Sequence, residues 1–166
     1  MTDQTATASR AKKTFWLLAV AVTVIFLDQL TKSLVIANLV PQQSYPFLGD
    51  LVHLYLTFNK SAAFSIGFGV TWVFTLISTL AALTVIWFGL RVRTVSWAVI
   101  GGVLLGGIVG NLIDRLTRAP GFPNGQVVDF IQIPFNFPIF NLADSAICVV
   151  AGVVVILVAR GQKIGG

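Results

Sequence analysis

The sequence predicts an all-α membrane protein: a four-transmembrane-helix bundle with a small β-sheet cap and an outer loop or helix outside the membrane. Its 166 residues are 56% hydrophobic and only 10% charged, whereas soluble globular domains carry about 25% charged residues. Four stretches are long and apolar enough to cross the hydrocarbon core, which takes about 20 helical residues. A chain of this length suffices for one domain, so we expect residues 1–166 to form a single membrane domain.

The four expected spans lie near residues 15–37, 71–90, 96–113 and 140–159. Ten basic residues outside the spans divide unequally between the two sides. Seven fall on one side: Arg10, Lys12, Lys13, Arg91, Arg93, Arg160 and Lys163. Because cytoplasmic loops carry an excess of Lys and Arg, we expect both termini to be cytoplasmic. The net charge of +5 is thus explained by membrane topology, and we expect no nucleic-acid partner.

Two segments, residues 38–70 and 117–139, face outward in this topology, and we expect them to form caps on the outer leaflet. In the first, apolar residues from Val52 to Phe58 occupy alternate positions, a period of two that indicates a strand with one apolar face. The second contains four prolines, so we expect no continuous helix there. It also contains four aromatic residues of the type that favours the bilayer interface: Phe122, Phe130, Phe135 and Phe137.

Small residues mark the third and fourth spans. Gly102, Gly106 and Gly110 repeat every four residues on one helix face, and such a stripe lets another helix approach closely. Cys148 is the single cysteine, which excludes an internal disulfide and a cysteine-based zinc cluster. It lies in an apolar run, so we expect it to be packed within the membrane domain.

Four of the six aspartates lie in or beside the expected spans: Asp28, Asp114, Asp129 and Asp144. A charge near the bilayer centre costs about 3 kcal/mol or more, so buried acids need a reason. Asp28 follows the start of the first span by roughly 20 Å of helix, which places it past the midplane, toward the outside. The other three lie at outer span ends or in the outer segment. We therefore expect all four acids to meet in one outer-leaflet layer.

Helical spacing groups the polar residues of this layer. Three sets share a helix face: Asp28 with Lys32, Asn111 with Asp114 and Arg115, and Asn141 with Asp144. Asp28 and Lys32 are spaced i,i+4 and are expected to pair. Asp114 has Arg115 beside it as an expected partner. For Asn141, a role at a helix end is as compatible with the sequence as a role in catalysis.

These pairings leave Asp129 or Asp144 without a local basic partner. Two carboxylates brought together share a proton, because both cannot easily ionise. One can then act as a general base on water while the other donates a proton, which is the chemistry of aspartic peptidases. His53 is the single histidine, so neither a histidine-based triad nor a histidine-based zinc site competes. No cofactor or metal is expected.

Two other classes of protein remain open from the residues alone. A small transporter or proton-coupled antiporter also uses buried aspartates in a four-span bundle, but its acids should lie near the midplane and open to both sides. A non-catalytic assembly subunit could use the glycine stripe of the third span as its interface.

Five short motifs carry a resemblance to a known family. They are Asp28-Gln29-Leu30-Thr31-Lys32, Asn59-Lys60-Ser61-Ala62-Ala63-Phe64, Gly110-Asn111-Leu112-Ile113-Asp114-Arg115, Val127-Val128-Asp129-Phe130 and Phe140-Asn141-Leu142-Ala143-Asp144-Ser145. In this order on four spans, they make the chain resemble the lipoprotein signal peptidase, or signal peptidase II, family. The resemblance covers nearly the whole chain.

The resemblance implies an aspartyl endopeptidase of the bacterial inner membrane that removes signal peptides from prolipoproteins at the outer face. The cut would fall just before a cysteine that carries diacylglycerol. By resemblance, Asp129 and Asp144 are the catalytic pair. Seven residues would line or support the site: Asn111, Arg115, Asn141, Asp114, Asp28, Lys32 and Asn59. Expected partners are diacylglyceryl-prolipoproteins and membrane lipid, and the chain is expected to be a monomer.

Two features depart from the family's pattern. Ser61 stands where the family usually has glycine, so we expect a different local turn. Residues Ala119–Asn124 form a longer stretch than usual, so we expect the gating of the site to differ.

Overall fold

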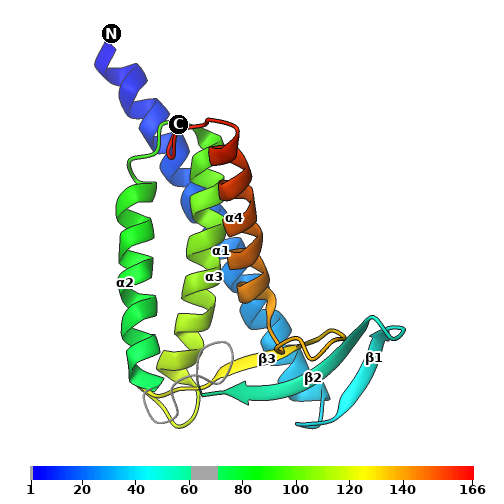
Figure 1. Cartoon of the computed structure of the whole chain (residues 1–166). Coiled ribbons are helices and arrows are strands. Elements are labelled where there is room, and N and C mark those ends of the chain that lie inside the picture. The colour runs from blue at the N-terminus through cyan, green and yellow to red at the C-terminus, as the bar shows by residue number, and fades with distance from the viewer. Residues whose placement is uncertain (1, 61–70) are drawn as a thin grey trace.

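The computed structural model describes residues 2–60 and 71–166, so the expectation about Ser61 lies outside the described residues. The elements are α1 (Thr2–Asn38), β1 (Ser44–Leu48), β2 (Val52–Asn59), α2 (Thr71–Gly89), α3 (Val95–Thr117), β3 (Val127–Gln132) and α4 (Leu142–Ala159). In this part of the chain, four helices are long and apolar enough to cross a membrane, and three strands form an antiparallel sheet in the order β1-β2-β3. The predicted fold class is confirmed (Figure 1).

Helix α3 packs against each of the other three helices. A methyl group built on Gly102 would come within 2.6 Å of the carbonyl oxygen of Leu17, and one on Gly106 within 2.9 Å of the carbonyl oxygen of Ala21. The stripe therefore lets the α1 backbone approach closely, as predicted. Gly107, on another face of α3, admits the start of α4 in the same way, 2.7 Å from the Ala143 carbonyl oxygen.

Two helices differ in length from the expected spans. Helix α1 has 37 residues, or about 55 Å, against a hydrocarbon core of about 30 Å, so its N-terminal turns project beyond the bundle (Figure 1). Helix α3 continues to Thr117 rather than ending near residue 113. Its last turns carry Asn111, Asp114 and Arg115, which are buried against other elements. Because these polar side chains have partners inside the protein, the helix can continue beyond its apolar stretch.

The three strands come from the two segments that were expected to face outward, residues 38–70 and 117–139. Strand β2 pairs with β1 on one side and β3 on the other, and the strand predicted around Val52–Phe58 is confirmed as β2. Leu56 of β2 and Val128 of β3 are almost fully buried and pack with Val35 of α1. The sheet therefore rests against the end of α1, and its packing fixes where β3 lies.

Two expectations about apolar side chains are wrong. Cys148 is exposed on α4 rather than packed in the bundle. Phe130 is 6% exposed and belongs to the sheet core rather than to an interfacial surface. The other three aromatic residues of this segment do lie exposed: Phe122, Phe135 and Phe137.

The two ends of the bundle differ. Both chain termini lie at one end, and the sheet covers the other (Figure 1). Because α1 runs toward the sheet, Asp28 and Lys32 lie near the sheet-covered end, where α3 ends and α4 begins. The topology thus brings one end of three helices against β3.

Candidate active site

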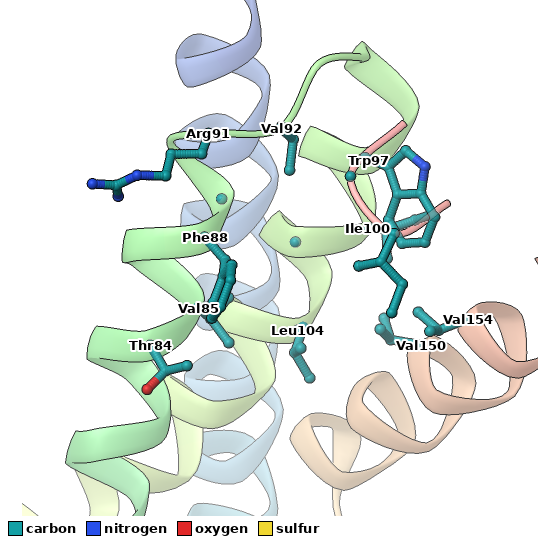
Figure 2. A pocket seen from close by; sticks show the side chains of 14 residues that line it. Thr84, Val85, Phe88, Arg91, Val92, Trp97, Ile100, Leu104, Val150 and Val154 are labelled. Atoms are coloured by element: carbon teal, nitrogen blue, oxygen red, sulfur yellow. The ribbon is translucent and has the colours of Figure 1, made fainter. Parts of the chain in front are cut away.

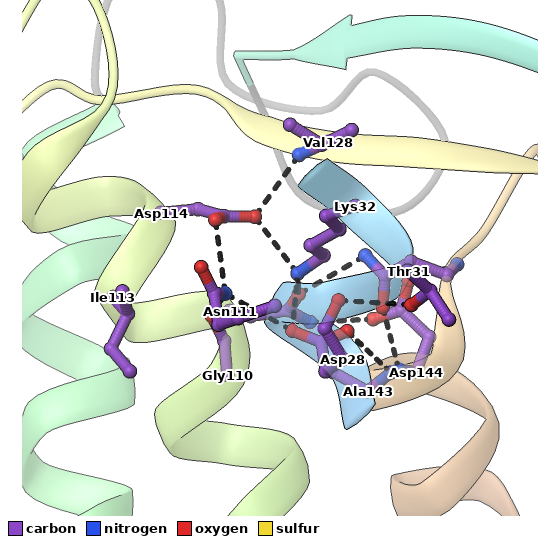
Figure 3. Close-up of polar contacts among 12 residues, drawn as sticks. Asp28, Thr31, Lys32, Gly110, Asn111, Ile113, Asp114, Val128, Ala143 and Asp144 are labelled. Atoms are coloured by element: carbon purple, nitrogen blue, oxygen red, sulfur yellow. Dashed lines mark hydrogen bonds and ion pairs between the residues drawn. The ribbon is translucent and has the colours of Figure 1, made fainter. Parts of the chain in front are cut away.

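Buried polar side chains gather where α1, α3, α4 and β3 meet (Figure 3). Asp28, Lys32, Asp114 and Asn141 are completely buried, and Asp129 is 2% exposed. The hydrogen bonds, ion pairs and charge interactions described below link all nine residues that the sequence singled out. The predicted polar layer is therefore a single connected cluster.

Asp129 is held through both oxygens of its carboxyl group. It lies on β3, opposite Thr57 of β2. The side-chain amide of Asn141 donates to Oδ1 over 2.7 Å, and that of Asn59 donates to Oδ2 over 2.8 Å. The carboxyl group is thus fixed between the sheet and the start of α4.

Asp144 is held in the same manner from α3 and from its own helix. Asn111 Nδ2 donates to Oδ1 over 2.8 Å, and the backbone N–H of Asn141 donates to Oδ2 over 3.2 Å. In return, Asn141 Oδ1 accepts from the backbone N–H of Asp144, which completes a capping box at the start of α4. Asn141 therefore serves as the helix cap and also bridges the carboxyl groups of Asp129 and Asp144.

The protonation of Asp129 follows from its surroundings. Burial raises the pKa of its carboxyl group to about 7, and the negative charge of Asp144 adds to the rise. Hydrogen bonds from Asn59 and Asn141 oppose it because they favour the ionised form. The charge of Asp144 raises the pKa of Asp129 because a nearby like charge disfavours ionisation.

Lys32 is the centre of a buried ionic group. Its Nζ lies 2.8 Å from Asp28 Oδ2, 2.8 Å from Asp114 Oδ2 and 2.9 Å from Asn111 Oδ1. An ammonium group has three donors, so each has an acceptor. The predicted Asp28–Lys32 pair is confirmed. The expected pairing of Asp114 with its neighbour is wrong, because Asp114 pairs with Lys32 and with Arg118 Nε at 2.6 Å.

The two carboxylates that share Lys32 also hold the backbone beside the pair. Asp28 Oδ1 accepts from the N–H of Ala143 over 3.0 Å, and Asp114 Oδ2 accepts from the N–H of Val128 over 3.2 Å. Ala143 precedes Asp144 and Val128 precedes Asp129 in the chain. Lys32 therefore pairs with both carboxylates that hold the backbone next to Asp129 and Asp144.

Arg115 lies beside the pair without an ion pair of its own in the described part of the chain. It is 9% exposed, and its Nη1 lies 3.5 Å from the carbonyl oxygen of Asn111. It interacts electrostatically with both Asp144 and Asp129. Within the described residues, its positive charge therefore lies near both acids without being neutralised by an ion pair.

Gln29 belongs to the first motif, but the sequence alone assigns it no role in the site. Its Nε2 donates to Asp28 Oδ2 over 3.2 Å, to Asp114 Oδ1 over 3.2 Å and to the carbonyl oxygen of Gly110 over 3.0 Å. It therefore joins α1 to α3 beside Lys32. Its position next to Asp28 is a signal in the sequence. However, an uncharged amide in a span requires a buried partner less strongly than a charged side chain does.

The stretch Ala119–Asn124 packs back onto the helices. Thr75 Oγ1 of α2 donates to the carbonyl oxygen of Pro123 over 2.7 Å. The N–H of Gly125 donates to the carbonyl oxygen of Arg115 over 3.1 Å, and a side chain on Gly125 would clash with the α3 backbone. This loop is thus tied to α2 and α3 close to Arg115. Within the described residues, no group of three or more His, Cys, Asp or Glu side chains could hold a metal ion.

Comparison with known proteins decides the family. Residues 20–160 match the family model described as signal peptidase (SPase) II. The chain belongs to the signal peptidase II family. The lipoprotein signal peptidase of Leifsonia xyli subsp. xyli is 47% identical over 150 residues, covering 90% of this chain and 69% of that protein. That of Mycobacterium avium is 46% identical over 142 residues, covering 86% and 76%.

Solved structures agree with this membership. A bacterial membrane enzyme determined by the in meso method at 2.3 Å resolution superposes with a TM-score of 0.77 at 26% identity. The match covers 89% of this chain and 91% of that one. This signal peptidase II is therefore a multi-pass bacterial membrane protein and an aspartic endopeptidase that cleaves signal peptides from prolipoproteins. Family membership decides against the transporter and assembly-subunit alternatives.

Proposed function

We propose that Asp129 and Asp144 are the catalytic pair of this peptidase, and that they cleave a diacylglyceryl-prolipoprotein just before its lipidated cysteine. The observation that carries the proposal is the bridge through Asn141, whose side chain contacts Asp129 while its backbone contacts Asp144. Two acids that contact the same residue lie close to one another. This arrangement supports catalysis by a carboxyl pair rather than by isolated ion pairs.

The raised pKa of Asp129 suggests how the two acids divide the chemistry. With a pKa of about 7, Asp129 keeps its proton below about pH 7. Asp144 then removes a proton from the water that attacks the scissile carbonyl carbon, while Asp129 donates its proton to the carbonyl oxygen. When the C–N bond breaks, the proton held by Asp144 passes to the leaving amine. As the carboxylic acid product forms, a hydroxyl proton of the tetrahedral intermediate returns to Asp129, so both acids end the cleavage in the protonation state in which they began.

Arg115 and Asn111 support the proposed reaction from α3. Arg115 is a buried cation that interacts with both carboxyl groups, and it is placed to stabilise charge on the tetrahedral intermediate. Asn111 holds Asp144 through its amide. The remaining predicted residues act through these groups: Asp28, Lys32 and Asp114 hold the backbone, and Asn59 holds Asp129.

The proposed site lies at the outer face of the membrane. Seven basic residues flank the span ends near the termini, which favours a cytoplasmic position for that end. Exposed Phe122, Phe135 and Phe137 belong to the segment between α3 and α4 at the opposite end, and aromatic rings favour the interface. A substrate anchored by its acyl chains and its apolar signal helix would present its peptide bond at this depth. The enzyme meets it there as a monomer, surrounded by membrane lipid.

Mobility of a diacylated prolipoprotein on a gel tests the catalytic assignment. Asp129→Asn and Asp144→Asn should each abolish the shift from precursor to mature protein, while the variants still insert and keep a wild-type unfolding transition. Asp50→Asn is the matched control, because Asp50 lies exposed in the turn between β1 and β2. Normal processing by either of the first two variants would contradict the assignment.

A further inference from the structure

A cavity lies toward the end of the bundle that carries both chain termini, away from the sheet (Figure 2). It occupies about 360 Å³ between α2, α3 and α4, within the range of about 300–1,000 Å³ typical of ligand sites. Its wall is mainly apolar and includes Val85, Phe88, Leu104, Val150, Val154 and Ile164. None of these residues belongs to the proposed peptidase site, so the cavity needs a separate explanation.

Small residues and the C-terminal tail shape this cavity. Gly89 and Gly101 line it through their backbones, and a side chain built on either would point toward Leu17 of α1. The tail folds back toward it, because the N–H of Arg93 donates to the carbonyl oxygen of Gly165 over 2.8 Å. Ile164, beside Gly165, contributes to the wall and is still 76% exposed.

The wall offers little to a polar ligand. Thr84 is its one hydroxyl-bearing residue, and Thr84 Oγ1 already donates to the carbonyl oxygen of Leu80 over 2.8 Å. Burying an unpaired polar group there would cost free energy, whereas a hydrocarbon chain would not. The part of any ligand that enters the cavity must therefore be apolar.

One basic residue lines the cavity, and two more are adjacent in the chain to residues of its wall. Arg91 belongs to the wall, and its guanidinium extends away from the cavity centre at the rim (Figure 2). It lies 4.0 Å from the centre of the Trp87 ring. Arg93 and Lys163 are exposed neighbours of the wall residues Val92 and Ile164. Trp87, which contacts Arg91 and is 52% exposed, is of the residue type that marks the headgroup level of a bilayer.

We propose that this cavity binds one acyl chain of an acidic phospholipid, whose phosphate is held by the cations at the mouth. The apolar wall matches the chain, and the rim matches the negative charge of the headgroup. A signal peptide fits less well, because it begins with a positively charged segment that these cations repel. The lipid would fill the space between α2 and α4 and hold α2 against α3, far from the peptidase site.

Titration of the full-length protein with lipid, followed by native mass spectrometry, tests this proposal. The probes are dioleoyl phosphatidylglycerol, which is acidic, and dioleoyl phosphatidylcholine, which is neutral overall and has the same chains. The wild type should retain one phosphatidylglycerol molecule with at least about fivefold higher affinity than phosphatidylcholine. Binding should also raise the unfolding temperature, because a ligand of the folded state stabilises it.

Paired variants separate the rim from the wall. Arg91→Gln with Arg93→Gln should remove the preference for phosphatidylglycerol, whereas Arg10→Gln with Lys12→Gln removes equal charge from α1 and should preserve it. Val154→Trp fills the cavity and should weaken binding of both lipids. Val155→Trp is its control, because Val155 is 67% exposed on the same helix and its replacement should bind like the wild type.

Three results would overturn the proposal. One is equal affinity of the wild type for the two lipids, and another is unchanged lipid binding by Val154→Trp. The third is displacement of phosphatidylglycerol by a synthetic signal peptide whose own binding Val154→Trp weakens, which would assign the cavity to the peptide. If Val154→Trp fails to fold, a photoreactive phosphatidylglycerol on the wild type replaces it. Labelling within residues 84–104 or 150–165 supports the site, and labelling confined to other residues refutes it.

Discussion

Lys32 Nζ donates to Oδ1 of Asn111 over 2.9 Å, and together with Asn141 Nδ2, which donates to the same oxygen over 3.0 Å, it sets which end of the Asn111 amide faces Asp144. A side-chain amide can present either its oxygen or its nitrogen, and the neighbouring groups select between them. Because the oxygen faces the buried ammonium, Nδ2 is free to donate to Asp144 over 2.8 Å. A lysine on α1 thus helps to orient a contact of the proposed catalytic pair, which it does not itself touch.

Replacement of Lys32 by methionine should destabilise the protein and inactivate it. Asp28 and Asp114 would lose the cation that lies 2.8 Å from each of them. Breaking a buried ion pair by removing one partner costs about 3–5 kcal/mol, because the other charge stays buried without compensation. Thermal unfolding in detergent should show a clearly lower transition for Lys32→Met.

The matched control for Lys32→Met is Lys12→Met, since Lys12 is exposed near the start of α1 and its loss should leave the transition unchanged. The double variant Lys32→Met with Asp28→Asn should recover part of the lost stability, because it removes one of the unpaired charges. A wild-type transition in Lys32→Met would show that the buried ammonium has no structural role.

The pH dependence of cleavage should report the Asp129 proton. Because Asp129 must be protonated to act as the acid and its pKa is about 7, kcat/KM should fall as the pH rises above about 7. The hydrogen bond from Asn59 favours the ionised carboxylate. Its removal in Asn59→Ala should therefore raise the pKa further and move the alkaline limb of the profile to higher pH.

The control for this profile is Asn38→Ala, whose side chain donates to the carbonyl oxygen of Leu34 far from Asp129. That variant should keep the wild-type limb. The readout is the position of the limb and not the rate alone, so a general loss of activity cannot imitate it. A limb that stays in place or moves to lower pH in Asn59→Ala would argue against Asp129 as the protonated acid.

Arg115 and Arg118 should differ in their effect on catalysis. Arg115 is a buried cation that interacts with both Asp129 and Asp144, so Arg115→Gln should lower kcat/KM by about 10²-fold. Arg118 is 23% exposed and pairs with Asp114, which keeps Lys32 as a second partner. Arg118→Gln should therefore cost a much smaller factor. Steady-state cleavage of a lipidated peptide measures both, and equal losses would refute the placement of Arg115 at the reaction.

The choice between these two arginines also shows what the sequence could predict. The i,i+4 rule that predicted the Asp28–Lys32 pair applies equally to Asp114 and Arg118, and the structure contains both pairs. A neighbour in the chain projects about 100° around the helix, so Arg115 points elsewhere. The Asp114–Arg118 pair can therefore be predicted from helical spacing. The neighbour Arg115 is a misleading candidate, because adjacent residues do not share a helix face.

Other features were beyond the sequence for physical reasons. Strand β3 exists because it pairs with β2, which is distant in the chain, and its buried run has no alternating pattern that local reasoning could use. The exposure of Cys148 illustrates a second limit. Lipid tails are as apolar as a packed interior, so hydropathy identifies a span but not which of its faces meets another helix. The glycine stripe did predict a helix contact. Close approach of two helices requires small residues on the contact face, and their spacing can be read from the sequence.

The same glycine-to-alanine change should have opposite effects on stability at a position in the stripe and at one outside it. A methyl group on Gly102 would come within 2.6 Å of the Leu17 carbonyl oxygen, which belongs to backbone and cannot move aside easily. Gly102→Ala should therefore separate α1 from α3 and lower the free energy of unfolding. Gly152, inside α4, has nothing within 4 Å of the same position. Gly152→Ala should raise stability by up to about 1 kcal/mol, because alanine favours helix more than glycine does. Unfolding of both variants in one detergent gives the comparison, and a loss of stability in Gly152→Ala equal to that in Gly102→Ala would show that helix contact is not what requires glycine at Gly102.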